Sequence, residues 1–217
     1  MGRVYAPGCA LMIYKPRLAH RVLASLRAEL GDVAEHDVCC RHQPGLPSDT
    51  EVINTCAGCD RRYRELYEGV TTVSLWEVLS ESERFRFPDY GGVTMAVHDA
   101  CPTRTEERAH AAVRRLLERM NIVVAEPEAT RTHAVCCGDS FFGQLPDARV
   151  KELMALRAGA MPVEDVVVYC ISCVKAMSLG GRRPRYLVDL LFDEETRPGV
   201  VEPGDWHAAL EAYVALH

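Results

Sequence analysis

The segment Asp165-Val-Val-Val-Tyr-Cys-Ile-Ser-Cys173 joins an apolar run to a Cys-x-x-Cys pair. Three consecutive valines between an aspartate and a tyrosine predict a strand over 165–169 that ends at Cys170. Earlier in the chain, Glu51-Val-Ile-Asn-Thr-Cys-Ala-Gly-Cys59 repeats this plan. Each of these strands is therefore expected to deliver a cysteine pair at its carboxyl end.

Apolar residues recur at helical spacing between the predicted strands. One stripe predicts a helix over 16–30, a second predicts a helix over 109–120, and the segment 147–161 is expected to be helical as well. Short strands are expected over 3–6 and 93–98. Because strands alternate with helices, we predict an α/β fold built from two similar Rossmann-like units with short parallel sheets.

A break between the two halves is expected near residue 90. The run 84–92 contains a proline and two adjacent glycines, which is typical of a linker. We therefore assign residues 1–90 to the first unit and 91–217 to the second. In the second unit Thr103-x-x-Glu106 has the form of a capping box, and Asp205 is expected to cap the last helix.

Ten cysteines fall into two sets of five in the same order. The first set reads Cys-x29-Cys-Cys-x15-Cys-x2-Cys and comprises Cys9, Cys39, Cys40, Cys56 and Cys59. The second set reads Cys-x34-Cys-Cys-x32-Cys-x2-Cys and comprises Cys101, Cys136, Cys137, Cys170 and Cys173. Open parallel sheets bind ligands outside the carboxyl ends of their strands, and Cys9, Cys56, Cys101 and Cys170 each follow a predicted strand. The repeated order predicts a duplicated cofactor site at those strand ends.

Several kinds of site could use these thiols. Cysteine thiolates hold iron–sulfur clusters, zinc or copper, because sulfur is a soft ligand. Zinc takes four tetrahedral ligands, and five cysteines with an adjacent pair overfill that arrangement. His36, His42 and His133 lie near the paired cysteines and could serve zinc, although solvated loop histidines explain them as well. A thioredoxin-like Cys-x-x-Cys site would leave three cysteines of each set unexplained.

Composition narrows the classes of function. The formal net charge of −6 argues against a nucleic-acid partner. No apolar run reaches the length of about 18 residues that a membrane span needs, and the N-terminus lacks the layout of a signal peptide. We therefore expect a cytoplasmic protein, in which thiols stay reduced and serve metal or redox chemistry more often than disulfide scaffolds.

Both cysteine sets resemble the cysteine-rich CCG domain, which occurs twice in the catalytic subunit of heterodisulfide reductase. The family pattern is one cysteine, then a Cys-Cys pair followed by glycine, then Cys-x-x-Cys. Cys136-Cys-Gly138 matches the central motif, and Cys56-Ala-Gly-Cys59 and Cys170-Ile-Ser-Cys173 match the last. Related domains occur in iron–sulfur subunits of anaerobic glycerol-3-phosphate dehydrogenase, lactate-utilisation and glycolate oxidase complexes. The resemblance covers most of the chain, residues 3–192.

The resemblance implies that each cysteine set holds a noncubane 4Fe-4S cluster, made of two fused smaller clusters with one bridging thiolate. In heterodisulfide reductase this cluster cleaves a disulfide by delivering electrons one at a time. Two departures from the family pattern concern the first set. Arg41 replaces the glycine after the Cys-Cys pair, and the following gap is x15 rather than the x32 of the second set. We expect the second site to follow the family more closely.

The implied function is that of an iron–sulfur oxidoreductase subunit, similar to the catalytic subunit of heterodisulfide reductase and acting on a small-molecule or protein disulfide. The alternative is a non-catalytic electron-transfer subunit that relays electrons to quinone or a partner dehydrogenase, and a zinc-binding module is a third possibility. The chain has neither a ferredoxin cysteine run nor a Gly-x-Gly-x-x-Gly fingerprint. We therefore expect an electron-donating partner subunit that carries flavin or cubane iron–sulfur clusters.

One candidate catalytic residue lies beside the second set. His98 precedes Cys101 in a His-Asp-x-Cys turn. Because the pKa of histidine lies near neutrality, His98 could donate a proton to a leaving thiolate. The alternative is a turn residue bonded to the backbone. Asp139, which follows the Cys-Cys-Gly motif, is expected to be a cap or turn residue.

Overall fold

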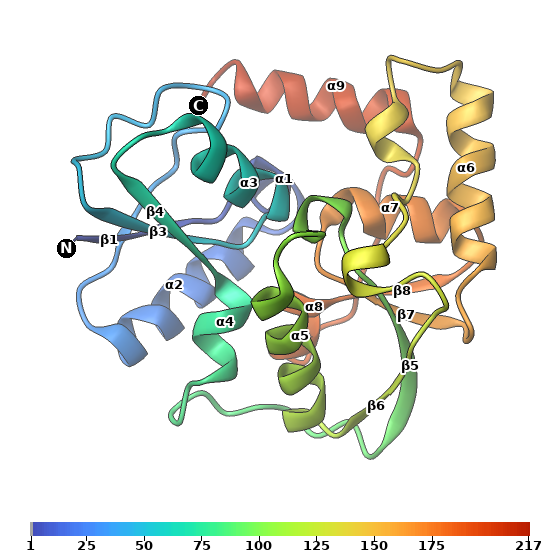
Figure 1. The fold of residues 1–217 in the computed structure, drawn as a ribbon, viewed down its shortest axis with the longest axis horizontal. Coiled ribbons are helices and arrows are strands. Elements are labelled where there is room, and N and C mark those ends of the chain that lie inside the picture. Colours follow the sequence, from blue (N-terminus) through green and yellow to red (C-terminus); the bar gives the residue numbers. More distant parts are fainter. Residues whose placement is uncertain (1) are drawn as a thin grey trace. The chain divides into compact units, whose positions relative to one another are not determined.

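The computed structural model describes residues 2–217 and confirms the predicted α/β architecture (Figure 1). Within these residues the strands form two four-stranded sheets, and every strand pairing is parallel. The first sheet has the order β2-β1-β3-β4, with β1 (Arg3–Ala6), β2 (Ala34–Glu35), β3 (Thr50–Asn54) and β4 (Val70–Ser74). The second has the order β6-β5-β7-β8, with β5 (Val93–His98), β6 (Ile122–Ala125), β7 (Asp165–Val168) and β8 (Arg183–Tyr186).

Helices connect the strands in both units. The first unit contains α1 (Cys9–Tyr14), α2 (Pro16–Leu30), α3 (Ala57–Leu66) and α4 (Leu75–Ser80). The later helices are α5 (Glu107–Arg119), α6 (Asp147–Gly159), α7 (Ile171–Leu179), α8 (Leu187–Leu191) and α9 (Pro203–Val214), with 3-10 turns η1 (Cys101–Thr103), η2 (Arg131–His133) and η3 (Asp139–Phe141). Figure 1 shows α2 and α3 on opposite faces of the first sheet. Within residues 2–217, every helix is too short or too polar to cross a membrane.

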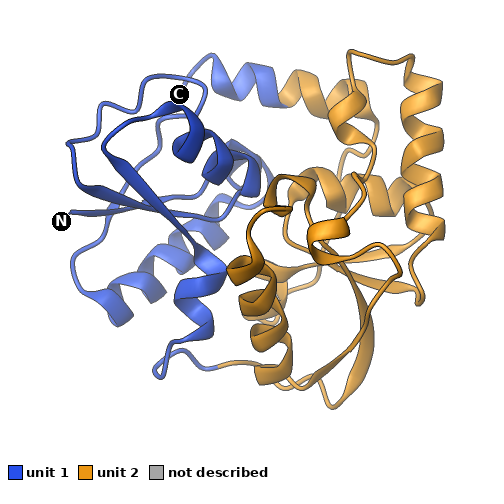
Figure 2. Ribbon diagram, viewed as in Figure 1, with its two compact units in different colours: residues 1–86, 210–217 blue, residues 87–209 orange. Residues whose placement is uncertain are grey.

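The two sheets belong to two compact units (Figure 2). The first unit comprises residues 1–86 and 210–217, and the second comprises 87–209. The division therefore lies four residues before the expected boundary at 90/91, because Tyr90 and Gly92 donate backbone hydrogen bonds to Met120 and Asn121 of the second unit.

The end of the chain returns to the first unit, which the sequence does not predict. The last residues, 210–217, contact the loop that carries the first Cys-Cys pair. The backbone N–H of Cys39 donates to the carbonyl of His217 at 3.2 Å, and His42 Nε2 bonds the carbonyl of Val214 at 2.9 Å. These bonds explain why the second half of α9 belongs to the first unit.

Local sequence signals determine where helix α2 begins, which face it buries and where it ends. Pro16 occupies the first turn, where its missing N–H costs nothing, and the apolar stripe from Leu18 to Leu26 is buried. The helix ends before Gly31, whose φ of 85° is a conformation that glycine adopts readily. The predicted helix over 16–30 is confirmed, and the strands expected at 3–6 and 93–98 are confirmed as well.

Two predicted helix caps are wrong. Thr103 lies in η1, where its hydroxyl donates to the carbonyl of Ala100, so it does not cap α5, which begins at Glu107. Helix α9 begins at Pro203, two residues before Asp205, because proline with its fixed φ suits a first helical position. A capping box does occur, between Ser74 and Glu77 at the start of α4.

The strand order places a topological switch point in each sheet. The chain moves from β1 outward to β2 on one side, and from β3 outward to β4 on the other. The same reversal separates β5 from β7 in the second sheet. In open α/β sheets, ligands bind in the crevice at the carboxyl ends of the two strands that border such a point. The fold therefore offers one binding crevice per unit.

The core of the second unit provides a test of its packing. Leu116 of α5 is fully buried, whereas Leu156 of α6 is 66% exposed. We expect Leu116→Ala to lower the free energy of unfolding by about 2–5 kcal/mol, because it leaves a cavity. The matched change Leu156→Ala should cost less than about 0.5 kcal/mol. Denaturant unfolding measures both values, and equal losses would contradict this packing.

Candidate metal centres

All ten cysteines lie on the carboxyl side of the sheets. The single cysteine of each set follows β1 or β5, the Cys-Cys pair follows the edge strand β2 or β6, and the Cys-x-x-Cys pair follows β3 or β7. The two strands that border each switch point therefore carry the single cysteine and the Cys-x-x-Cys pair. The Cys-Cys pair reaches the same end of the sheet from the strand beside them.

The thiols of each set are hydrogen-bonded to one another in an unbroken chain. In the first unit the order is Cys9, Cys39, Cys40, Cys59 and Cys56. In the second unit the order is the same at the matching positions: Cys101, Cys136, Cys137, Cys173 and Cys170. All ten cysteines are free thiols. The fold thus brings together every cysteine of each predicted set.

In each row of thiols, the first cysteine of the Cys-Cys pair has a lowered pKa. Hydrogen bonds from the thiols of Cys40 and Cys9 lower the pKa of Cys39 to about 2. Hydrogen bonds from Cys101 and Cys137 likewise lower the pKa of Cys136. The thiolate is the form of cysteine that binds metals. Each set is therefore organised around a sulfur that already favours the metal-binding form.

Backbone amides stabilise both acidic sulfurs. The N–H of Gly138 donates to Cys136 Sγ at 3.3 Å, and the Ser140 hydroxyl lies 2.9 Å from the same sulfur. In the first unit the backbone N–H of Arg41 donates to Cys39 in the same way. The replacement of glycine by Arg41 therefore keeps the backbone hydrogen bond.

Glycine at position 138 has a second role, in packing against α6. Its φ is 108°, and a Cβ there would lie 2.9 Å from Met154 Cγ and 3.0 Å from Met154 N. We expect Gly138→Ala to cost about 1–2 kcal/mol for the left-handed backbone and about 1–3 kcal/mol more for overpacking. Gly143 has a φ of 76° and open space around it. Gly143→Ala should therefore lower the stability only by the cost of the left-handed backbone, about 1–2 kcal/mol. Equal losses of stability in the two variants on thermal unfolding would contradict the close approach of Gly138 to Met154.

Asp99 ties the cysteine-bearing segments of the second unit together. Its fully buried carboxylate accepts two hydrogen bonds from Arg114, at 2.6 and 2.8 Å. The same carboxylate accepts a bond from the Tyr169 hydroxyl, next to Cys170, and one from the backbone N–H of Arg131, before the Cys-Cys pair. Burial raises the pKa of Asp99, but Arg114 outweighs burial and the pKa falls to about 2. Asp99 therefore acts as a buried structural anion rather than a simple turn residue.

Removal of this anion should be costly. Asp99→Asn would remove the fully buried partner of Arg114, which keeps its ion pair with the partly exposed Glu126, and would weaken the bonds from Tyr169 and from the Arg131 backbone. We therefore expect a loss of about 1.5–3 kcal/mol in the free energy of unfolding. Glu152→Gln breaks the exposed pair between Glu152 and Arg149 and should cost less than about 1 kcal/mol. Denaturant titration of both variants is the measurement. A D99N loss as small as that of E152Q would refute the anchoring role.

His98 lies beside the second cysteine set, as its position in the sequence suggests. One ring nitrogen lies within 4.8 Å of the sulfur atoms of Cys137 and Cys173. Burial, and then the nearby Arg157 cation, lower the pKa of His98 to about 3, so the expected near-neutral pKa is wrong. His98 Nδ1 accepts a hydrogen bond from Arg157 Nε at 3.1 Å, and Nε2 is buried without a partner. Because Nδ1 accepts, the proton of the neutral ring is assigned to Nε2.

Arg157 is the residue near this site that sequence reasoning misses. It comes from α6, a helix to which nothing in the first unit corresponds, and lies 59 positions from His98 in the chain. A single arginine within a helix carries no motif, so only the packing of α6 shows that Arg157 is buried. The predicted helix over 147–161 is confirmed, but its polar contribution to the site does not follow from the sequence.

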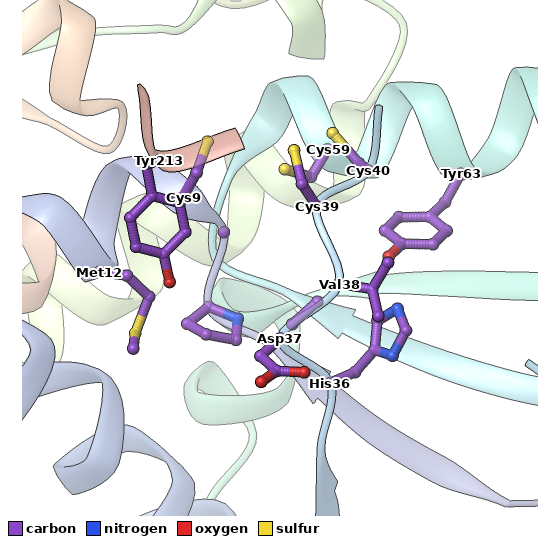
Figure 3. Close-up of a pocket in the computed structure, with 13 residues that line it drawn as sticks. Cys9, Met12, His36, Asp37, Val38, Cys39, Cys40, Cys59, Tyr63 and Tyr213 are labelled. Carbon is purple, nitrogen blue, oxygen red and sulfur yellow. The ribbon is translucent and has the colours of Figure 1, made fainter. Parts of the chain in front are cut away.

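A pocket lies against the first cysteine set (Figure 3). It is lined on one side by Cys9, Met12 and Tyr213, and Figure 3 shows the sulfur atoms of Cys39, Cys40 and Cys59 gathered beside it. Buried His36 also lines this pocket, and its Nε2 has no hydrogen-bond partner. A thioether, a phenol ring and several thiols therefore meet in one small space.

The other candidate side chains make ordinary contacts. His42 Nε2 bonds the carbonyl of Val214, and His133 Nδ1 lies 3.2 Å from the Thr132 hydroxyl. Asp139 Oδ1 lies 3.1 Å from His207 Nε2. Among residues 2–217, the only cluster of three or more possible metal ligands within 4.8 Å of one another is His98, Cys137 and Cys173.

No protein-family model and no curated protein matches this chain. The likeness to the CCG domain therefore rests on the cysteine pattern, and the case for function rests on the geometry of the two sites.

Proposed function

We propose that this protein is the disulfide-reducing subunit of an iron–sulfur oxidoreductase, similar to the catalytic subunit of heterodisulfide reductase. One observation carries the proposal: a chain of five hydrogen-bonded thiols occurs twice, in the same order, at the switch points of two sheets of the same topology. Such a repeat supports a pair of like cofactors, and we propose a noncubane 4Fe-4S cluster in each unit.

The spread of the thiols favours a cluster over zinc. Four sulfur ligands around one zinc ion lie about 3.8 Å apart, given a zinc–sulfur distance of about 2.3 Å and tetrahedral geometry. Within residues 2–217, no four candidate ligand atoms all lie within 4.8 Å of one another. An extended row of five thiols suits a group several ångströms across better than a single ion.

The residues of the chain would hold and surround each cluster. The ligands would be Cys9, Cys39, Cys40, Cys56 and Cys59 in the first unit, and Cys101, Cys136, Cys137, Cys170 and Cys173 in the second. The amides of Arg41 and Gly138 would donate hydrogen bonds to ligand sulfurs, which favours their ionised form. When bound, an iron–sulfur cluster supplies one-electron transfer, and cleavage of a disulfide takes two electrons in all.

The pocket of the first unit has a volume of about 10 Å³, which is room for about one water molecule, so it does not favour a substrate over a relay. Met12 and Tyr213 place a thioether and an aromatic ring beside Cys9. The choice of a disulfide as substrate therefore rests on the likeness of the cysteine pattern to the CCG domain. Sulfur atoms are buried in both units, at Cys39, Cys40 and Cys59 in the first and at Cys137 and Cys173 in the second, which is compatible with the alternative function. In that alternative the protein relays electrons to quinone or a partner dehydrogenase.

The proposal requires an electron donor. Disulfide reduction consumes two electrons, and the ten cysteines are all assigned to the two clusters. We therefore propose a partner subunit with flavin or cubane iron–sulfur clusters. The proposal also places the protein in the cytoplasm, where thiols stay reduced.

Metal analysis of anaerobically purified protein tests the proposal first. We expect about eight irons and eight acid-labile sulfides per chain, four for each cluster. Cys137→Ala should lower the iron to about four, and the matched change Cys40→Ala should do the same in the first unit. Replacement of His98 should leave the iron unchanged. Zinc without sulfide, or full iron in the Cys137 variant, would refute the assignment.

Turnover separates the two candidate functions. With a chemically reduced viologen as electron donor, the proposed enzyme should convert a disulfide into two thiols for every two electrons consumed. Iron-loaded protein that oxidises the viologen with quinone but leaves every disulfide intact would instead support the relay.

A further inference from the structure

A buried cation without a carboxylate partner lies next to the second cysteine set. Arg157 is 5% exposed, and its Nη2 donates to the carbonyl of Ala129 at 2.8 Å. Among residues 2–217, no carboxylate oxygen lies within 4.0 Å of its guanidinium nitrogens, and Asp99 is engaged by Arg114. A buried charge is costly unless an opposite charge compensates it. The groups that counteract the effect of burial on the pKa of Arg157 are Cys173, then Asp99 and Cys137.

His98 connects this cation to the sulfurs. Arg157 Nε donates to His98 Nδ1, so the imidazole presents its single N–H at Nε2, on the other side of the ring. That N–H is buried and has no partner within the described chain. The sulfurs of Cys137 and Cys173 belong to the same group of atoms within 4.8 Å. The ring can therefore donate to a sulfur of the site, and it cannot ligate a metal through Nε2 while that proton is present.

The first unit lacks this arrangement. Ala6 occupies the position that corresponds to His98, at the end of the strand that precedes the single cysteine. Nothing in the first unit corresponds to α6, and no lysine or arginine among its described residues is buried. Buried His36 lines the pocket there, but no buried cation stands behind it. Within the described part of the chain, the first set therefore has no counterpart of the buried cation Arg157, since Arg41 is exposed and Arg62, which donates to the carbonyl of Cys40, is only partly buried.

We propose that Arg157 and His98 raise the reduction potential of the cluster at the second cysteine set above that of the cluster at the first set. This inference rests on the proposed function. Each one-electron reduction adds one negative charge to a cluster, and the electron comes from the partner subunit or, in a titration, from dithionite. A nearby buried cation and a hydrogen bond to a ligand sulfur both favour the more negative form. Removal of the cation should therefore lower the potential.

The test compares the two clusters within one protein. An anaerobic redox titration followed by electron paramagnetic resonance gives the midpoint potential of each cluster, and the C40A and C137A variants assign the two signals. In the wild type we expect the signal of the second set to have the higher midpoint potential. In Arg157→Met we expect the equilibrium constant for reduction at the second set to fall at least tenfold, which is about 59 mV for one electron.

Two controls accompany the Arg157→Met variant: the potential of the cluster at the first set, and a variant of Arg149. The potential at the first set should stay unchanged in Arg157→Met. Arg149→Met removes an exposed, ion-paired arginine from the same helix and should move neither potential. An iron-loaded Arg157→Met protein with an unchanged second potential, or with equal shifts at both sets, would overturn the inference. Absence of iron and sulfide from the wild type would instead overturn the proposed function.

If Arg157→Met fails to fold, a second measurement that keeps Arg157 tests the inference. In the C40A variant with nitrogen-15-labelled histidine, pulsed electron paramagnetic resonance should detect one weakly coupled histidine nitrogen at the remaining cluster, as a hydrogen-bond donor produces. The signal should disappear in a C40A variant that also carries His98→Phe. A strongly coupled, directly ligated nitrogen, or no histidine nitrogen, would overturn the role of the pair.

Discussion

Five sulfur atoms crowded at one end of a short parallel sheet repel one another once they ionise, and much of the surrounding structure compensates that repulsion. The Cys-x-x-Cys pairs lie at the N-termini of α3 and α7, where free backbone N–H groups and the helix dipole favour negative charge. The amides of Gly58 and Cys59 donate to Cys56 in this way. The Cys-Cys pairs receive an amide from the residue that follows each of them. Short strands suffice for this fold because they only have to deliver the sulfurs to a common edge.

The two units reach the same arrangement of sulfurs by different means. In the first unit the hydroxyls of Tyr5 and Thr55, 3.0 Å apart, join β1 to the residue before Cys56. In the second unit a buried ion pair does the corresponding work, with Asp99 at its centre. A neutral pair of hydroxyls takes the place of that ion pair in the first unit, where the buried charge beside the cysteines is the carboxylate of Asp60 rather than a cation. The duplicated fold therefore holds two chemically unequal environments around sulfurs of equal number and order.

Most of the fold can be predicted because periodicity and burial agree along the chain. The strand over 93–98 and the helix over 16–30 match the structure to the residue. Two edge strands are not predicted from the sequence. β2 has only two residues, both exposed, and β6 has only four residues, all apolar, so neither shows the alternation that identifies a strand. The helix caps expected at Thr103 and Asp205 are wrong because a local motif does not determine which tertiary partner a side chain finds.

The candidate sites likewise contain features that can be predicted from the sequence and features that cannot. Which cysteines come together follows from their order and from the rule that parallel strands share one carboxyl edge. The positions of Arg157 and Asp99 in the site depend on contacts with side chains from distant segments. Residue spacing in the sequence does not predict such contacts. The pKa of His98 cannot be read from the sequence for the same reason, because burial and a cation from α6 determine it.

The return of residues 210–217 to the first unit has a consequence for biosynthesis. A ribosome makes Cys9, Cys39 and Cys40 early, but the carbonyl of His217 that accepts the bond from Cys39 follows only after the whole second unit has been made. During that interval the first cysteine loop lacks part of its packing, and its thiols are open to oxidants and to stray metal ions. The thiols that are synthesised first are therefore among the last to be packed against their complete surroundings.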